Sequence, residues 1–160
     1  MFHIAICDDE KIFRDQLNSF LLKYAEKVGE DFDILMYDSA DRLLLNYPKD
    51  LDLLFLDIAM GGINGMEAAQ EIRKTDSQVC IIFITTMVQY AIDGYAVKAF
   101  GFIRKPVSEA ELKHELTCAL AMIQNSKARE QYITIKTGGT IHRIAISRIR
   151  YCEGKNHQII

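Results

Sequence analysis

A regular alternation of short apolar runs with longer amphipathic stretches constrains this chain more than any other feature of its sequence. The apolar runs are rich in aliphatic and β-branched residues and predict strands at residues 2–7, 32–38, 51–57, 79–85 and 99–105. The stretches between and after them place apolar residues at helical spacing and predict helices at residues 10–28, 39–47, 64–74, 87–97 and 108–126. The helix at 87–97 is the weakest, because Gly94 costs about 1 kcal/mol relative to Ala in a helix interior.

This order of elements predicts an α/β fold. Strands that are apolar on both faces and alternate with helices form a parallel sheet that is covered on both sides. Five such units fit one doubly wound domain over residues 1–124, and we expect a flavodoxin-like five-stranded parallel sheet. The sequence does not by itself determine the order of the strands.

The pattern changes after the polar residues 125–131, which predict a linker or a fraying helix end. In residues 132–160, Ile133, Ile135 and Ile141 lie on either side of the turn signal TGGT and predict a β-hairpin. A second turn signal, EGKN, precedes the start of another strand. About 30 residues cannot close a core, so we expect this segment to begin an all-β second domain of a longer protein.

The net charge of −3 conceals an asymmetry between the two parts of the chain. Residues 132–160 hold five basic residues and one acidic residue, whereas residues 1–131 hold 14 basic and 21 acidic residues. This division indicates an acidic module joined to a basic one that faces a polyanion.

The sequence also bears on the compartment. It contains no apolar stretch of about 18 residues, and its N-terminus, MFHIAICDDE, lacks the basic and apolar regions of a signal peptide. We therefore expect a cytoplasmic protein without a membrane partner. The four cysteines, Cys7, Cys80, Cys118 and Cys152, form no CxxC pair, and we expect them to act as small buried hydrophobic residues.

Polar residues follow four of the five predicted strands. They are Asp8, Asp9 and Glu10 after the first strand, Asp57 after the third, Thr85 and Thr86 after the fourth, and Lys105 after the fifth. The carboxyl ends of parallel strands share one edge of the sheet, which is where open α/β sheets bind ligands. We therefore expect three carboxylates, a hydroxyl and an ammonium from this set to converge in one shallow pocket.

Carboxylates that lie close together repel one another, and a divalent cation relieves that repulsion. Mg²⁺ prefers hard oxygen ligands and is often held by one or two carboxylates together with phosphate oxygens. One carboxylate could then act as a nucleophile and form an acyl phosphate, while Lys105 and Thr85 contact the phosphate oxygens. The alternative is structural: the acidic run could cap the next helix, and Asp57 could be a turn residue.

At these residues the sequence resembles the receiver domain of two-component response regulators. The matching motifs are CDDE, LDIAMGGINGMEAAQEIR, FITT and GFIRKP, in that order. The resemblance implies that Asp57 accepts a phosphoryl group from a sensor histidine kinase and that Thr85 and Lys105 contact it. It further implies a Mg²⁺ site made of Asp8, Asp9, Asp57 and the carbonyl of Ala59, and a switch made of Thr85 and Phe102.

Two positions depart from the family pattern. Gly61 stands where a Pro is usual, so we expect a more mobile loop, and Thr86 stands where a small residue is common, which could restrict closure around the phosphoryl group. Neither position removes a group that the chemistry needs.

The tail resembles the start of a LytTR-type DNA-binding domain. The resemblance depends on the hairpin and on the pattern I-x-x-I-x-Y-x-E at Ile146, Ile149, Tyr151 and Glu153. It offers Lys155, Asn156 and His157 as DNA contacts, although a solvated turn explains these three residues equally well.

The motifs leave three functions to compare. The first is a response regulator that dimerises on phosphorylation, with Tyr90 and Tyr95 near the dimer face, and that controls transcription through a DNA-binding domain truncated here. The second is a stand-alone receiver that acts by protein–protein contact. The third, a phosphatase, is disfavoured because Ala59 occupies the place of the acid that such enzymes carry two residues after the nucleophile, so no enzyme is expected.

Overall fold

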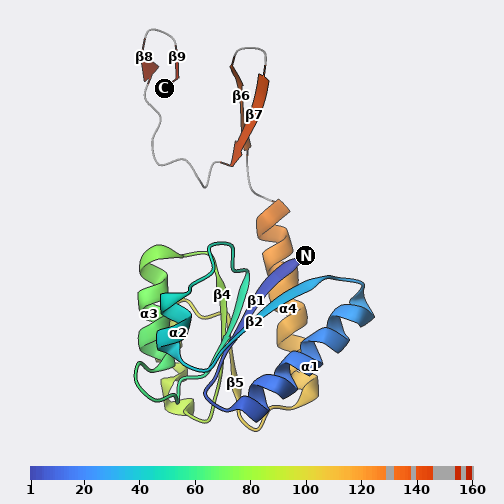
Figure 1. Ribbon diagram of the computed structural model, residues 1–160, viewed down its shortest axis with the longest axis vertical. Helices are drawn as coiled ribbons and strands as arrows, with labels where there is room; N and C mark the ends of the chain where they lie inside the picture. The colour runs from blue at the N-terminus through green and yellow to red at the C-terminus, as the bar shows by residue number, and fades with distance from the viewer. Residues whose placement is uncertain (129–131, 138–139, 146–153, 156–157, 160) are drawn as a thin grey trace. The chain divides into compact units, whose positions relative to one another are not determined.

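Five parallel strands make up the central sheet of the computed structural model, which describes residues 1–128, 132–137, 140–145, 154–155 and 158–159. The strands, labelled in Figure 1, are β1 (Phe2–Cys7), β2 (Phe32–Tyr37), β3 (Leu53–Leu56), β4 (Cys80–Thr85) and β5 (Gly101–Arg104). Their order is β2-β1-β3-β4-β5, and every neighbouring pair is parallel. This is the flavodoxin-like order, so the predicted fold class is confirmed.

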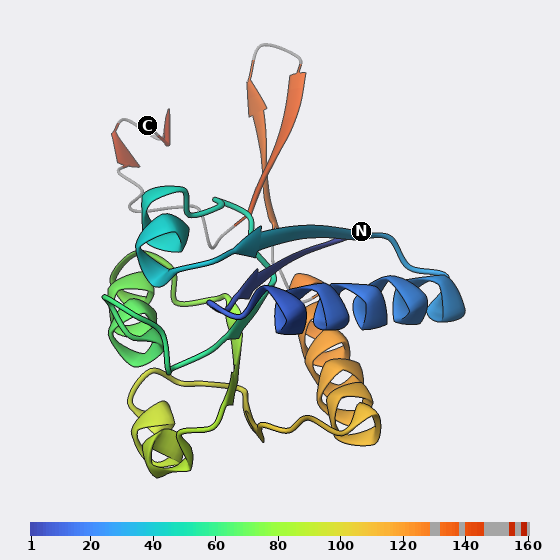
Figure 2. The same ribbon diagram turned by 60° about the horizontal axis from the view of Figure 1, so that its bottom comes forward.

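Four α-helices cover the sheet. They are α1 (Lys11–Val28), α2 (Ala40–Leu45), α3 (Gly65–Thr75) and α4 (Glu109–Ala128). Figure 2 shows α1 and α4 on one side of the sheet and α2 and α3 on the other. The helix ends follow local chemistry: Ser39 caps α2, Asn64 and Glu67 form a capping box on α3, and Gly29 ends α1 in the left-handed region.

The helix predicted at residues 87–97 is wrong. The chain there forms two short 3₁₀ turns, η1 (Val88–Ala91) and η2 (Asp93–Tyr95). Val88, Ile92 and Tyr95 are exposed, so the segment lacks the buried apolar face that supplies most of the stability of a protein helix. β-Branched residues and Gly94 lower its helix propensity further.

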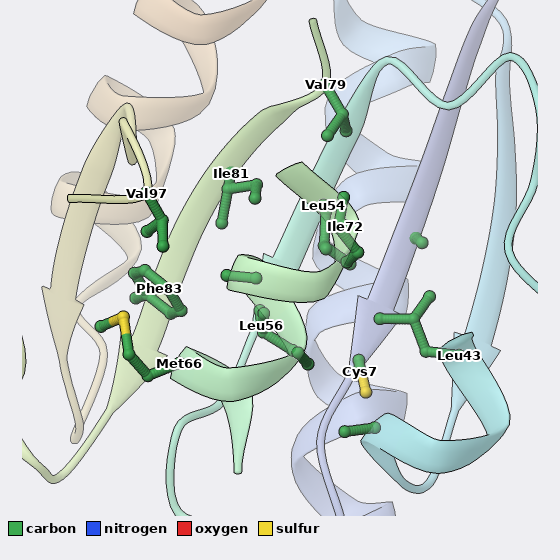
Figure 3. Packing of buried hydrophobic residues seen from close by; sticks show 14 of the residues in the cluster. Cys7, Leu43, Leu54, Leu56, Met66, Ile72, Val79, Ile81, Phe83 and Val97 are labelled. Atoms are coloured by element: carbon green, nitrogen blue, oxygen red, sulfur yellow. The ribbon is translucent and has the colours of Figure 1, made fainter. Parts of the chain in front are cut away.

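The core divides into two layers, because successive strand residues point to opposite faces. Ala5, Cys7, Leu54, Leu56, Ile81 and Phe83 face Leu43 of α2 and Met66 and Ile72 of α3, as Figure 3 shows. The alternate strand residues, Ile4, Ile6, Leu53, Phe55, Ile82 and Ile84, are also buried. Strands β1, β3 and β4 are therefore fixed from both sides, and so are the points at which they end.

Backbone hydrogen bonds continue the sheet just beyond these ends. The amide of Asp57 donates to the carbonyl of Cys7 at 2.9 Å, and the amide of Lys105 donates to the carbonyl of Thr85 at 2.9 Å. The residues that follow the strands are thus held in sheet-like register, with their positions set by neighbouring strands and not by loops.

A second unit comprises residues 121–160, whereas the first comprises residues 1–120. In the second unit, β6 (Tyr132–Thr137) and β7 (Thr140–Ala145) pair antiparallel with Thr137 opposite Thr140, which confirms the predicted hairpin. Strands β8 (Gly154–Lys155) and β9 (Gln158–Ile159) also pair antiparallel. Of the predicted linker, residues 125–128 belong to α4 and residues 129–131 lie outside the described residues.

Within the described part of the chain, none of the helices has the length and apolar character that crossing a bilayer requires.

Candidate functional site

Lys105 is the centre of a polar cluster at the carboxyl edge of the sheet. Its Nζ lies 2.8 Å from Oδ2 of Asp8, 2.9 Å from Oδ2 of Asp57 and 3.1 Å from Oε1 of Glu10. The Lys105 side chain is only 9% exposed. The structure therefore brings together residues that are up to 97 positions apart in the sequence, as the strand-end argument predicts.

The two buried carboxylates are oriented in the same way. Oδ1 of Asp8 accepts a hydrogen bond from the amide of Glu10 at 2.9 Å, and Oδ1 of Asp57 accepts one from the amide of Ala59 at 3.0 Å. Side-chain bonds to the backbone two residues on are typical of Asp in turns. In both residues this leaves Oδ2 directed at Lys105. Asp8 is 1% exposed and Asp57 is 3% exposed, so both orientations are fixed inside the protein.

Asp9 adds a third acid. Ligand oxygens of Asp8, Asp9 and Asp57 all lie within 4.8 Å of one another, and Asp9 is the exposed member of the set. Oδ2 of Asp8 is the one buried side-chain oxygen or nitrogen in the described residues without a hydrogen bond, since its close contact with Lys105 lacks hydrogen-bond geometry. Three clustered carboxylates with an unsatisfied oxygen fit a hard divalent cation such as Mg²⁺.

Burial works against the charged form of Asp8. Desolvation raises the pKa of the Asp8 carboxyl above its usual value, although the close contact with the Lys105 ammonium and the hydrogen bond from the amide of Glu10 oppose the shift. A cation placed against this oxygen would favour its charged form. The electrostatics of the pocket therefore agree with its donor set.

Lys105 stays protonated despite its burial. Desolvation lowers its pKa, but the close contacts with the Asp8 and Asp57 carboxylates and their charges outweigh that effect and raise the pKa above its usual value. The ammonium also lies 4.4 Å from the centre of the Phe13 ring, a distance at which cations are attracted to aromatic faces. The pocket thus holds a permanent positive charge next to Asp57.

Thr85 is the last residue of β4 and is fully buried. Its Oγ1 accepts a hydrogen bond from the amide of Met87 at 3.2 Å, so the hydroxyl hydrogen remains to be donated. The neighbouring Thr86 is exposed.

Phe102 lies in β5 and is half-buried. Its ring centroid is 6.3 Å from that of Phe83, and it packs against the core cluster. Of the predicted DNA contacts, Lys155 lies in β8, and Asn156 and His157 lie outside the described residues.

Gly65 is a site residue that the motifs do not reveal. A Cβ at this position would lie 2.0 Å from the carbonyl oxygen of Asp57, so only glycine allows α3 to begin this close to the loop that follows Asp57. The amide of Gly65 also donates to the carbonyl of Ile58 at 3.2 Å. One signal was available, because a Gly directly after the helix cap Asn64 is not a favoured choice for the first helical residue.

Fold and site together define a class of protein. It is a flavodoxin-like α/β domain with a cluster of carboxylates that could hold a metal ion, and with a buried lysine, at the carboxyl edge of its sheet. The chain belongs to the response regulator receiver domain family, whose model matches residues 4–117. It is therefore the receiver domain of a two-component system.

The curated relatives are named as sensory transduction proteins. The chain is 33% identical to the sensory transduction protein LytT of Oceanobacillus iheyensis over 134 residues, which cover 80% of this chain and 52% of the relative. It is 30% identical to LytT of Bacillus subtilis over 149 residues, which cover 88% and 60% respectively. The chain spans about half the length of these relatives.

Solved structures agree with the fold. The response regulatory domain of mrkE from Klebsiella pneumoniae matches with a TM-score of 0.68 at 24% identity and covers 78% of this chain and 99% of its own. The response regulator TrrA from Thermotoga maritima, solved in complex with Mg(2+)-BeF, matches with a TM-score of 0.65 at 29% identity and covers 74% and 99%.

Proposed function

We propose that Asp57 is the phosphoryl acceptor of this receiver domain and that Mg²⁺ is held by Asp8, Asp9, Asp57 and the carbonyl of Ala59. One observation carries the proposal: the buried Asp57 carboxylate lies 2.9 Å from the Lys105 ammonium in the pocket that also gathers Asp8 and Asp9. The Mg(2+)-BeF complex of the TrrA structure supports it by likeness.

The reaction is the transfer of a phosphoryl group from a phosphohistidine of a sensor histidine kinase. The donor P–N bond breaks, a P–O bond forms to an Asp57 carboxylate oxygen, and the histidine nitrogen takes up the proton that completes its neutral form. Lys105 supplies positive charge to the phosphoryl oxygens, and Thr85 donates its hydroxyl hydrogen to one of them. Bound Mg²⁺ neutralises the charge that builds up in such transfers.

Phosphorylation would act on the rest of the protein through Thr85 and Phe102. Thr85 leads directly into residues 86–97, where Val88, Ile92 and Tyr95 are exposed, whereas Tyr90 packs partly against the core. An exposed apolar group of this kind is suited to protein contact. A homodimer that forms through this surface on activation is our expectation, with Tyr95, at 84% exposed, at the contact.

The output is proposed to be transcription control in the cytoplasm by a LytTR-type DNA-binding domain that begins at residue 132. The relatives named LytT and the basic character of residues 132–160 support this. Lys155, Asn156 and His157 remain the candidate DNA contacts. The alternative is a stand-alone receiver that acts by protein contact, and the hairpin would then be an appendage.

Incubation with acetyl phosphate and Mg²⁺ followed by intact-mass measurement tests the acceptor. We expect the wild type to gain one phosphoryl group, and Asp57→Asn or removal of Mg²⁺ with EDTA to abolish the gain. Asp15→Asn, which changes an exposed acid on α1, is the matched control and should behave as the wild type. Uptake by Asp57→Asn would refute the assignment, and steady turnover of a generic phosphate ester would favour a phosphatase instead.

A further inference from the structure

Glu10 occupies an unusual position between the site and α1. It is the N-cap residue of α1, yet its side chain makes no capping hydrogen bond, and glutamate is not among the residues that favour this position. The side chain extends instead to Lys105, with Oε1 at 3.1 Å from Nζ. The position therefore serves the pocket and not the helix.

This contact adds a third carboxylate around the Lys105 ammonium. Nζ of Lys105 has three carboxylate neighbours: it donates hydrogen bonds to Glu10 and Asp57 and forms an ion pair with Asp8 at 2.8 Å. Phosphorylation of Asp57 converts one of these three carboxylates into an acyl phosphate, and the phosphoryl oxygens then compete with Asp8 and Glu10 for the same ammonium. Glu10 makes the longest of the three contacts and is 66% exposed, whereas Asp8 and Asp57 are buried. It is the one side chain of the three that is free to move into solvent.

We propose that Glu10 is a positioning residue that competes with the incoming phosphoryl group for Lys105. It holds the ammonium in the unphosphorylated domain and gives way when Asp57 is modified. This inference rests on the proposed phosphoryl acceptor. It predicts that the charge of Glu10 lowers the affinity of the pocket for the phosphoryl group.

The exposure of the Glu10 side chain limits how much its charge can lower the affinity for the phosphoryl group. A phosphoryl group adds negative charge beside the negative charge of Glu10, and both seek the same ammonium. Because Glu10 is largely exposed, solvent screens the interaction, and a several-fold effect on affinity is expected and not one of many orders of magnitude.

Titration with beryllium fluoride at saturating Mg²⁺, followed by NMR of the backbone amides, measures this affinity in the intact chain. We expect Glu10→Gln to bind beryllium fluoride about three- to fivefold more tightly than the wild type. Glu10→Ala should behave similarly, which guards against an effect of the new amide. Asp15→Asn removes the same charge from the first turns of α1 outside the pocket and should stay within about twofold of the wild type.

A second measurement separates this role from a general change in the pocket. The affinity for Mg²⁺ alone should be unchanged or weaker in Glu10→Gln, because a negative charge near the cation has been removed. A loosened pocket would bind both ions more weakly. Equal effects of Glu10→Gln and Asp15→Asn, or weaker beryllium fluoride binding by Glu10→Gln, would overturn the proposal. If Asp57 is not the acceptor, beryllium fluoride binding will survive Asp57→Asn, which is a different failure.

Discussion

Single residues decide whether the loop that follows Asp57 has room to form. Gly65 is the clearest case, because the first turn of α3 lies against the carbonyl of Asp57 and leaves no space for a Cβ. Gly61 in the same loop is different: a Cβ there would meet nothing within 4 Å. Two glycines four residues apart thus have unequal importance, although the sequence presents them alike.

Gly65→Ala should therefore damage both stability and the site. We expect the free energy of unfolding to fall by about 1–3 kcal/mol, the usual cost of overpacking a closed region, together with weaker binding of beryllium fluoride and Mg²⁺. Gly61→Ala is the matched control, with a change within about 0.5 kcal/mol. Urea unfolding and ion titration of the two variants provide the test, and equal behaviour of the two would contradict the packing argument.

The strand-end residues could be predicted from sequence, whereas two features of the site could not: the contact of Glu10 with Lys105 and the need for glycine at position 65. Asp8, Asp57, Thr85 and Lys105 each follow an apolar run, and the parallel sheet turns that regularity into proximity. Glu10 and Gly65 depend on distances across the fold: one on the reach of a side chain to β5, the other on the approach of a helix to a carbonyl. No local pattern encodes such distances.

At the scale of elements, burial separates the correct predictions from the wrong one. The helices that were predicted correctly bury an apolar side, as α3 does with Met66, Ala69 and Ile72. The segment 87–97 has similar apolar content but exposes much of it. Periodicity alone cannot reveal whether a face has something to pack against, which is why this one element was misassigned.

Gly94→Ala should stabilise this segment. The new Cβ would lie 3.7 Å from Cβ of Ala99 and 4.0 Å from the Phe83 ring, which are ordinary contacts. Restricting the unfolded chain without strain in the folded one is worth about 0.4–1 kcal/mol. Urea unfolding should show that gain, and amide hydrogen exchange in residues 88–97 should slow.

Gly62→Ala is the contrasting variant. Gly62 has a φ of 78°, and a Cβ there would approach Oδ2 of Asp41 to 3.0 Å. The same substitution should therefore destabilise the protein. A loss of stability in Gly94→Ala would show that the 3₁₀ turns require glycine.

At the scale of the whole molecule, buried thiols link stability to alkaline pH. Burial raises the pKa of Cys80 from 9.0 to about 12. A pKa that is higher in the folded state means that the thiol contributes stability below pH 9, where both states are protonated. That contribution is lost as the pH rises from 9 toward 12, because only the unfolded state ionises in this range.

Cys80→Ala should flatten this dependence. One thiol contributes a slope of up to about 1.4 kcal/mol per pH unit, so the variant's free energy of unfolding should fall less steeply above pH 9 than that of the wild type. Denaturant unfolding between pH 8 and pH 11 measures the two slopes. Any constant loss of stability from the smaller side chain leaves the comparison intact, and parallel curves would exclude the shifted thiol.

The two units of the chain differ in how far the sequence specified them. Residues 1–120 were predicted almost completely, because a parallel sheet with a filled core leaves a strong pattern in every element. The β6–β7 hairpin was predicted from its turn signal alone.

The hydrogen bond from the amide of Met87 to Thr85 Oγ1 connects the start of the exposed segment 87–97 to a residue of the pocket. If the hydroxyl turns toward a newly attached phosphoryl group, its oxygen leaves that amide, and the first tie of residues 87–97 to the sheet is released. Phosphorylation of Asp57 would thereby loosen the attachment of residues 87–97, which expose apolar side chains, to the end of β4.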